Sequence, residues 1–220
     1  MKRRRSQTGA DTVAVAVPPS IFRAYDIRGV VGQSLTAEGV RQIGRAIGSQ
    51  ARELGRRSLV VGRDTRFSSE AFAKALAEGL CAAGCNVVDI GLVTTPVMYF
   101  ATQVSSSDSG VMVTASHNPP EYNGLKVVLG GEALHGQAIQ RLRQRIEQGA
   151  LACGEGRVEH WDPRAAYRER ILCDVRLARR LKLVIDCGHG TAGRIAPNLF
   201  RELGCDLTAL DCGAGRPGED

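Results

Sequence analysis

Apolar positions along this chain follow two spacings, one typical of helices and one typical of buried strands. Apolar residues three and four apart predict helices over residues 36–54, 69–83, 95–103 and 137–148. Short apolar runs predict strands over residues 58–62, 86–91, 110–113 and 125–129. Thr36 is a candidate N-cap for the first helix, and Pro96 suits the first turn of the third. Helices and strands that alternate in this way predict a layered α/β fold.

A small, glycine-rich segment, residues 149–156, separates this pattern from a shorter one. The second pattern predicts helices over residues 163–173 and 192–203 and strands over residues 181–186 and 206–210. Two strands and two helices are too few for a layered domain unless they pack against the first unit. We therefore predict a polar, disordered tail over residues 1–18, a first domain over residues 19–158 and an incomplete second domain over residues 159–220.

Composition and charge predict a folded protein with a nearly neutral body. Hydrophobic residues make up 43% of the chain and charged residues 24%, which suffices for a core. The formal net charge is +6, but Lys2, Arg3, Arg4 and Arg5 lie together in the tail. They supply four of the 29 basic residues, which leaves 25 against 23 acidic ones. This balance argues against a nucleic-acid partner.

Targeting patterns and cysteine usage favour a cytoplasmic protein with no membrane partner. The apolar run over residues 13–17 is too short for the core of a secretory signal. No stretch approaches the roughly 18 continuous apolar residues of a membrane span. The seven cysteines are odd in number and include no C-x-x-C pair, so they fit neither a zinc site nor a disulfide framework. We expect them to be reduced and buried.

Four polar clusters interrupt the apolar pattern and hold the residues that could do chemistry. They are F-R-A-Y-D-I-R-G at residues 22–29, G-R-D-T-R-F-S-S at 62–69, T-A-S-H-N-P-P-E-Y-N-G-L-K at 114–126 and D-C-G-H-G-T-A-G at 186–193. Three of them follow predicted strands, whose carboxyl ends are where ligands collect in α/β sheets. Their positive charges suit a phosphorylated ligand and come from Arg23, Arg28, Arg63, Arg66 and Lys126.

Ser116 is the candidate reactive residue of the third cluster. A serine hydroxyl is a weak nucleophile unless a base, a metal or a strong electrophile assists it. His117 is adjacent, but neighbouring side chains at a strand end usually point apart, and the G-x-S-x-G turn of serine hydrolases is absent. The residues alone leave two interpretations open. Ser116 carries a phosphoryl group, whose charge Arg28 and Lys126 neutralise, or the loop is a plain Asn-Pro turn.

The four clusters resemble, in order and approximate spacing, the motifs of the α-D-phosphohexomutase superfamily. The resemblance rests on Y-D-I-R-G, G-R-D-T-R, the S-H-N-P loop with its following N-G-L-K, and D-C-G-H-G-T-A-G, and it runs from about residue 19 to residue 212. F-R-A-Y-D-I-R-G favours the branch that acts on mannose and glucose phosphates over the glucosamine branch. The resemblance implies domain I of this superfamily, a layered mixed sheet flanked by helices, and an incomplete domain II.

The resemblance also implies a reaction and the residues that perform it. Members of the family move a phosphoryl group between the 1- and 6-hydroxyls of a phosphorylated hexose. Ser116 would donate the group as a phosphoserine and receive one back from a 1,6-bisphosphate. Lys126 would assist proton transfer at the sugar hydroxyl, and Arg28 would hold phosphate charge. From the residues alone, Arg28 could instead be a surface ion-pair partner.

Three further residues match positions near the substrate in the family. The resemblance implies that Tyr25 faces the sugar and that His117 and Asn118 shape the loop and bind substrate. Two of them have a structural alternative, because Tyr25 could be a core residue and His117 a satisfied structural histidine. Asp64 and Arg63, neighbours in G-R-D-T-R, are expected to brace the site rather than to touch substrate.

The resemblance further implies one Mg²⁺ ion, held by the phosphate on Ser116 and by carboxylates. The family's metal motif, D-G-D-G-D, is absent from this chain, as are its G-E-x-S-G-H sugar-reading loop and its C-terminal phosphate loop. We therefore expect a truncated chain with weak or no mutase turnover by itself. The alternatives are a non-catalytic remnant or binding module, a phosphoglucosamine mutase and a serine hydrolase.

Overall fold

The computed structural model describes residues 17–213 of the chain. The tail predicted for residues 1–18 therefore lies, except for its last two residues, outside the described part. A short 3-10 turn, η1 (Pro19–Ile21), begins the fold, and Ile21 is buried at its end. Within the described residues, no helix has the length and apolar character needed to cross a membrane.

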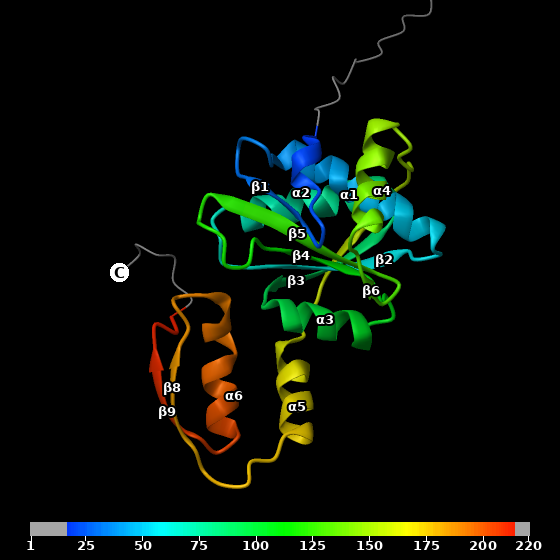
Figure 1. Ribbon diagram of the computed structural model, residues 1–220. Coiled ribbons are helices and arrows are strands. Elements are labelled where there is room, and N and C mark those ends of the chain that lie inside the picture. The colour runs from blue at the N-terminus through cyan, green and yellow to red at the C-terminus, as the bar shows by residue number, and fades with distance from the viewer. Residues whose placement is uncertain (1–16, 214–220) are drawn as a thin grey trace, which may run out of the picture.

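A seven-stranded sheet forms the centre of the first unit (Figure 1). Its strands are β1 (Ile27–Val30), β2 (Ser58–Arg63), β3 (Asn86–Leu92), β4 (Gly110–Val113), β5 (Tyr122–Leu129), β6 (Glu132–Ala133) and β7 (Val158–His160). They lie in the order β1-β5-β4-β2-β3-β7, with β6 beside β5. β2 pairs in parallel with β3 and β4, whereas β5 runs antiparallel to its neighbours β1 and β4. The predicted layered, mixed sheet is confirmed.

Helices cover both faces of this sheet. They are α1 (Ala37–Glu53), α2 (Ser69–Ala82), α3 (Thr95–Val104) and α4 (Gln137–Glu147). Figure 1 shows α1, α2 and α4 on one face and α3 on the other. The predicted cap of α1 is confirmed, since Thr36 Oγ1 accepts a hydrogen bond from the Gly39 amide at 3.1 Å.

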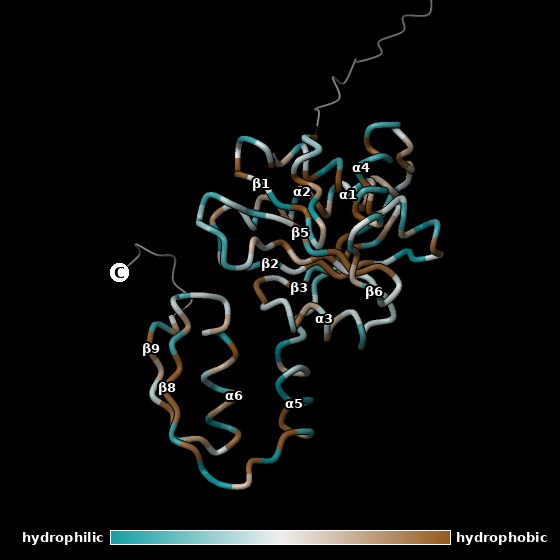
Figure 2. Tube along the Cα trace, viewed as in Figure 1, coloured by the Kyte–Doolittle hydropathy of each residue, from teal (hydrophilic) through white to brown (hydrophobic). Residues whose placement is uncertain are grey.

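Alternation along the strands divides the hydrophobic core into two layers. Val111 and Val113 of β4 pack with the helices α1, α2 and α4, whereas Met112 between them packs with α3. All four residues of β4 are buried, because both of its faces are covered. Figure 2 shows the hydrophobic positions gathered along these central strands. The Ser116 loop begins at the carboxyl end of β4 and therefore starts from a rigidly packed strand.

Besides the two-residue β6, two longer strands of the sheet were not predicted. β1 lies within the polar cluster at residues 22–29 and pairs with β5, with Arg28 opposite Gly124. β7 is only three residues long, is exposed throughout, and pairs in parallel with β3. Neither strand has a long apolar run, so periodicity carries little signal for them. The boundary at residue 158 stays a prediction, and β7 crosses it.

The second unit is a two-stranded parallel sheet with helices. It comprises α5 (Arg164–Asp174), β8 (Lys182–Asp186), η2 (Thr191–Arg194), α6 (Ala196–Glu202) and β9 (Asp206–Leu210). The single helix predicted for residues 192–203 is wrong, because a 3-10 turn and a short α-helix meet at Ile195. Pro197 explains the break, since a proline has no N–H to donate and its ring crowds the carbonyl four residues earlier.

The second unit packs against the first through α3. The rings of Phe100 on α3 and Tyr167 on α5 meet edge to face, with centroids 5.5 Å apart and planes at 71°. Ile195 joins the core layer of α3, and Trp161 packs against the same layer. This contact sets the distance between the loop after β8 and the loops of the main sheet.

We predict that Tyr167→Ala loosens the second unit while the first remains folded. The change removes an aromatic contact worth about 0.5–1.5 kcal/mol beyond the buried area. Hydrogen exchange measured by mass spectrometry should become faster over residues 182–210 and stay unchanged over the main sheet. Tyr99→Ala, at a half-exposed tyrosine on α3, is the matched control. Equal exchange in both variants would contradict the prediction.

Candidate functional site

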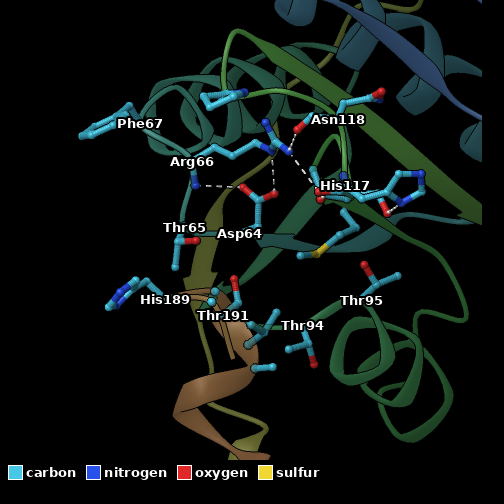
Figure 3. Close-up of a pocket in the computed structure, with 18 residues that line it drawn as sticks. Asp64, Thr65, Arg66, Phe67, Thr94, Thr95, His117, Asn118, His189 and Thr191 are labelled. Carbon is cyan, nitrogen blue, oxygen red and sulfur yellow. Dashed lines mark hydrogen bonds and ion pairs between the residues drawn. The ribbon is translucent and has the colours of Figure 1, made fainter. Parts of the chain in front are cut away.

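A cavity of about 570 Å³ opens between the two units at the carboxyl ends of β2, β4 and β8 (Figure 3). The loop after β2, the loop after β4 and the first residues of α3 form one side. The loop after β8 forms the other. The lining residues that carry polar side chains are Asp64, Thr65, Arg66, Thr94, Thr95, Thr114, Ser116, His117, Asn118, His189 and Thr191. Three of the four polar clusters in the sequence therefore meet here.

The Ser116 loop presents its serine through a left-handed backbone turn. Ser116 has φ = 57°, a conformation that costs about 1 kcal/mol or more for a residue with a Cβ. Two short hydrogen bonds hold the turn. The Ser116 amide donates to Thr114 Oγ1 at 2.9 Å, and the Asn118 amide donates to the Ala115 carbonyl at 3.1 Å. Ser116 itself is exposed at the end of a buried strand. Its hydroxyl is therefore open to the cavity.

Ser116 and His117 do not point apart, which corrects the expectation from sequence. Ser116 Oγ lies 3.1 Å from His117 Nδ1, within hydrogen-bond distance. The expectation assumed extended backbone, in which neighbouring side chains alternate. The positive φ of Ser116 breaks that alternation and brings the two side chains to the same side.

Arg66 holds the whole loop in place. Its guanidinium donates four hydrogen bonds to backbone carbonyls: Ser116 at 2.9 Å, Asn118 at 2.6 Å, Pro119 at 2.8 Å and Tyr122 at 3.0 Å. The planar fork of arginine suits several converging acceptors, and bonds from an ionised donor are stronger than neutral ones. The side chain is only 14% exposed. One cation thus replaces the regular pairing that this irregular segment lacks.

Asp64 positions Arg66 in turn. Its carboxylate accepts hydrogen bonds from the Arg66 amide at 3.1 Å and from the Ser69 hydroxyl, and it lies 3.4 Å from Arg66 Nε. Figure 3 shows Asp64 and Arg66 joined in this way beside Asn118. Asn123 of β5 donates to the hydroxyls of Ser68 and Ser69 at 2.8 and 3.0 Å. The loops after β2 and β4 therefore form one polar network.

Arg28 and Lys126 meet at a third residue, Asp26. Arg28 forms a hydrogen-bonded ion pair with the Asp26 carboxylate, and Lys126 Nζ lies 4.0 Å from the same oxygen. Asp26 is buried, whereas Lys126 keeps 29% of its side chain exposed. Among the described residues Arg28 Nε has no hydrogen-bond partner. Asp26 thus positions both cations and leaves one donor unused.

Strand register places these cations on the cavity face of the sheet. Lys126 lies directly opposite Met112, and Arg28 lies opposite Gly124, two residues before Lys126. Residues opposite each other across a pair, and residues two apart on one strand, share a face. Met112 lines the cavity, although Arg28 and Lys126 are not among its lining residues. The two cations therefore lie on the same face and beside the cavity rather than inside it.

Tyr25 stands apart from the cavity. It precedes β1, is 77% exposed and does not line the cavity. A core position for Tyr25 is therefore wrong, and its contact with a substrate stays a prediction. Arg63, at the end of β2, lines a different cavity.

His189 reaches the site from the second unit. Gly188 and His189 both have positive φ, 49° and 54°, so the loop after β8 turns sharply. The His189 amide donates to the Asp211 carbonyl at 2.7 Å, and its Nε2 lies 3.5 Å from the Asp211 carboxylate. Figure 3 shows His189 and Thr191 across the cavity from Asn118 and His117.

The described residues do not by themselves fit a Mg²⁺ site. Mg²⁺ prefers several oxygen ligands in a regular octahedron. No group of three or more His, Cys, Asp or Glu side chains in the described part of the chain could hold a metal ion. Asp64, the carboxylate that lines the cavity on the Ser116 side, already accepts from Arg66 and Ser69. A phosphate on Ser116 could supply one ligand. Bound Mg²⁺ therefore stays a prediction, and Ser116 is the one position at which the described residues support it.

Two positioning roles were not expected from sequence. In the sequence Arg66 stands out only as a positive charge, and Asp26 only as one residue of Y-D-I-R-G. Both act through contacts between segments distant in sequence: Arg66 bonds to a carbonyl 56 residues away, and Asp26 approaches Lys126 on β5. Periodicity carries no information about such contacts.

Comparisons with known proteins agree with this arrangement. Residues 19–152 match the family described as phosphoglucomutase/phosphomannomutase, alpha/beta/alpha domain I. The chain is 51% identical over 199 residues to a phosphomannomutase/phosphoglucomutase of Pseudomonas aeruginosa and 41% identical over 199 residues to a phosphoglucomutase of Neisseria gonorrhoeae. The chain therefore belongs to the phosphoglucomutase/phosphomannomutase family, as its motifs indicated.

A solved structure shows the same fold. The crystal structure of a phosphoglucomutase/phosphomannomutase family protein from Burkholderia thailandensis matches 90% of this chain, with a TM-score of 0.86 and 48% identity. That match covers 45% of the Burkholderia chain. The two sequence relatives are each matched over 43% of their length and over 90% of this chain. The chain thus spans less than half the length of the relatives it matches.

Replacing Arg66 by methionine should release the Ser116 loop. Four charge-assisted hydrogen bonds are lost, and we expect the free energy of unfolding to fall by about 1–3 kcal/mol. Hydrogen exchange should speed up over residues 114–122, measured together with urea unfolding. Arg66→Lys keeps the charge but not the planar, forked guanidinium. Its unfolding free energy and its loop exchange rate should therefore lie between those of the wild type and of Arg66→Met. Arg63→Met, at the end of β2 just before this loop, is the control. A 114–122 loop as well protected in Arg66→Met as in the wild type would refute the assignment.

Proposed function

We propose that the chain carries the phosphoserine half of a phosphohexomutase, which interconverts the 1- and 6-phosphates of mannose or glucose. The observation that carries the proposal is the exposed Ser116 hydroxyl, held at a positive φ and open to a cavity between the units. Membership of the family supports the assignment. The proposed substrate is a phosphorylated hexose.

In the proposed step, a sugar hydroxyl attacks the phosphorus of phosphorylated Ser116. The bond between phosphorus and Ser116 Oγ breaks as the new P–O bond forms, and the proton of the sugar hydroxyl ends on Oγ. We assign this proton movement to Lys126, which gives a proton to Oγ and receives one from the sugar. The reverse step returns the other phosphate of the 1,6-bisphosphate to Ser116. Such a transfer depends on positioning and on neutralised charge.

Three features of the site support the electrostatic part of the proposal. Arg28 and Lys126 bring two positive charges to the cavity face, and their shared partner Asp26 offsets only one of them. The buried Nε of Arg28 is a donor with no acceptor among the described residues, and a phosphate oxygen would supply one. The first residues of α3, Thr94 and Thr95, line the cavity, and a helix N-terminus favours an anion.

His117 has two proposed roles. Its contact with Ser116 Oγ orients the unphosphorylated hydroxyl, and with Asn118 it forms part of the surface that would bind the sugar phosphate. The same contact favours a second candidate function, a serine hydrolase. That candidate needs a group to orient the imidazole, and no described carboxylate bonds to His117. Labelling of Ser116 by a fluorophosphonate probe would support the hydrolase over the mutase.

We predict that the purified chain takes one phosphoryl group from glucose 1,6-bisphosphate onto Ser116. Intact mass spectrometry should show the adduct, and Ser116→Ala should abolish it. Ser106→Ala, at an exposed serine before β4, is the matched control. Mannose and glucosamine bisphosphates distinguish the branches of the family, and parallel reactions with and without Mg²⁺ test the metal. An unmodified wild-type chain would indicate a non-catalytic remnant or binding module.

Lys126→Met should slow the uptake of phosphate by about 10²–10⁴-fold, the usual contribution of a positioned acid or base. Arg28→Met should also slow uptake, because phosphate charge then lacks its partner. Both rates are measured by quenched mass spectrometry under single-turnover conditions. Lys74→Met, at an exposed lysine on α2, removes a charge elsewhere and should leave the rate unchanged. Uptake as fast in Lys126→Met as in wild type would remove Lys126 from the mechanism.

A further inference from the structure

Two of the seven cysteines lie against each other at the carboxyl ends of β8 and β9. Cys187 directly follows β8, and Cys212 lies two residues beyond β9. Cys212 Sγ lies 3.2 Å from Cys187 Sγ, within hydrogen-bond distance, and 3.1 Å from the Leu210 carbonyl oxygen. A disulfide needs its sulfurs about 2 Å apart. The two atoms therefore need to approach by only about 1 Å to be joined.

The other cysteines are placed differently, and the expectation that all are buried is wrong. All seven are free thiols, but only Cys85 and Cys205 are buried. Cys153 and Cys173 are exposed. Among the described residues, Cys187 and Cys212 form the one sulfur–sulfur contact, and both cysteines are half-buried. Both cysteines are accessible to a small reagent, and their sulfur atoms are already in contact.

Backbone hydrogen bonds hold the two cysteines in register. The Cys187 amide donates to the Leu210 carbonyl at 3.1 Å, and the His189 amide donates to the Asp211 carbonyl at 2.7 Å. These bonds continue the pairing of β8 with β9 beyond the strands. Gly193 rests on the Cys212 backbone so closely that an added Cβ would lie 2.2 Å from the Cys212 carbonyl oxygen. The proximity of the sulfurs thus follows from backbone packing on both sides.

The pair sits at the base of the loop that lines the cavity. Cys187 precedes residues 188–191, all of which line it. The Gly190 amide donates to the Cys187 carbonyl at 2.8 Å, which closes the turn. Because Gly193 contacts Cys212, both ends of the loop meet the cysteine pair. A covalent bond between the sulfurs would fix the second unit's side of the cavity.

We propose that Cys187 and Cys212 form a site of reversible thiol–disulfide exchange, with a low-molecular-weight disulfide such as glutathione disulfide as the oxidant. The Cys212 thiolate attacks one sulfur of the reagent, releases one glutathione thiolate and forms a mixed disulfide. The Cys187 thiolate then attacks the Cys212 sulfur and releases the second glutathione thiolate. The protein loses two electrons, which reduce the disulfide bond of the reagent, and two protons, which the two released glutathione thiolates take up. This site is independent of the proposed phosphoryl transfer.

The order of attack follows from the environment of Cys187. Burial, and then the hydrogen bond and charge of the neighbouring Cys212 sulfur, raise the pKa of Cys187 to about 11. Cys187 is therefore almost fully protonated at neutral pH, and the first attack falls to Cys212. Ring closure by Cys187 should become about tenfold faster for each unit that the pH rises while it stays below that pKa, because only the thiolate attacks.

The experiment exposes the fully reduced chain to glutathione disulfide without oxygen, followed by acid quenching and alkylation. The free thiols should fall from seven to five, and the intact mass should fall by two hydrogen atoms. Arg194 and Arg201 lie between the two cysteines, so trypsin releases them on separate peptides when they are not joined. Fragmentation of the linked peptide distinguishes Cys212 from Cys205. Added dithiothreitol should restore seven thiols.

The matched variants are Cys187→Ser and Cys212→Ser, which should retain no internal link, and Cys173→Ser, which should retain it. Amide exchange over residues 188–193 should slow in the oxidised wild-type chain. Three results overturn the proposal: seven free thiols after oxidant, glutathione adducts on single cysteines only, or links only between copies of the chain. Should a serine variant fail to fold, peptide mapping of the wild-type chain decides alone.

Discussion

The hydrogen bonds from the Arg66 guanidinium to the Ser116 loop are the interaction on which the candidate site depends. An irregular loop at the end of a buried strand exposes carbonyl groups that no neighbouring strand can satisfy. Three of these carbonyls, and that of Tyr122 at the start of β5, converge on Arg66, and Asp64 fixes the arginine from the other side. This clamp offsets the strain of the positive φ at Ser116. Apart from the clamp, only local hydrogen bonds such as that from the Ser116 amide to Thr114 Oγ1 hold the described turn.

The layering of the fold explains why the clamp can work. β4 is buried on both faces, so the loop leaves a strand that has little freedom to move. β2, which carries the start of the Asp64–Arg66 segment, is its parallel neighbour, and the Asp64 amide donates to the Val113 carbonyl at 3.1 Å. The two loops therefore start from adjacent strands at the same edge of the sheet. The cations Arg28 and Lys126 enter from the antiparallel side through β1 and β5, with Asp26 between them.

Periodicity predicted the helices of the first unit and the strands β2, β3 and β4 to within about two residues, because a buried face imposes a regular spacing. It began β5 at residue 125 instead of Tyr122, and it missed β1, β6 and β7, whose pairing comes from neighbours rather than from an apolar run. It also overlooked the effect of Pro197 on the last helix. The motifs indicated Ser116 and its loop directly. The contact of Ser116 with His117 could not be predicted, because it depends on one left-handed residue. The clamp of Arg66 depends on contacts between residues that lie 50 to 56 positions apart in the sequence.

The two sides of the cavity differ in how firmly they are held. The Ser116 side is fixed by a charged network within a seven-stranded sheet. The His189 side belongs to a two-stranded sheet whose β8 leaves Val184 69% exposed and which reaches the first unit through α3 and α5. Cavity shape therefore depends mainly on the weaker side. A covalent link between Cys187 and Cys212 would act on that side, since it ties the ends of the cavity loop to the strands beneath it. The proposed chemistry at Ser116 and the proposed disulfide thus lie in separate parts of the chain.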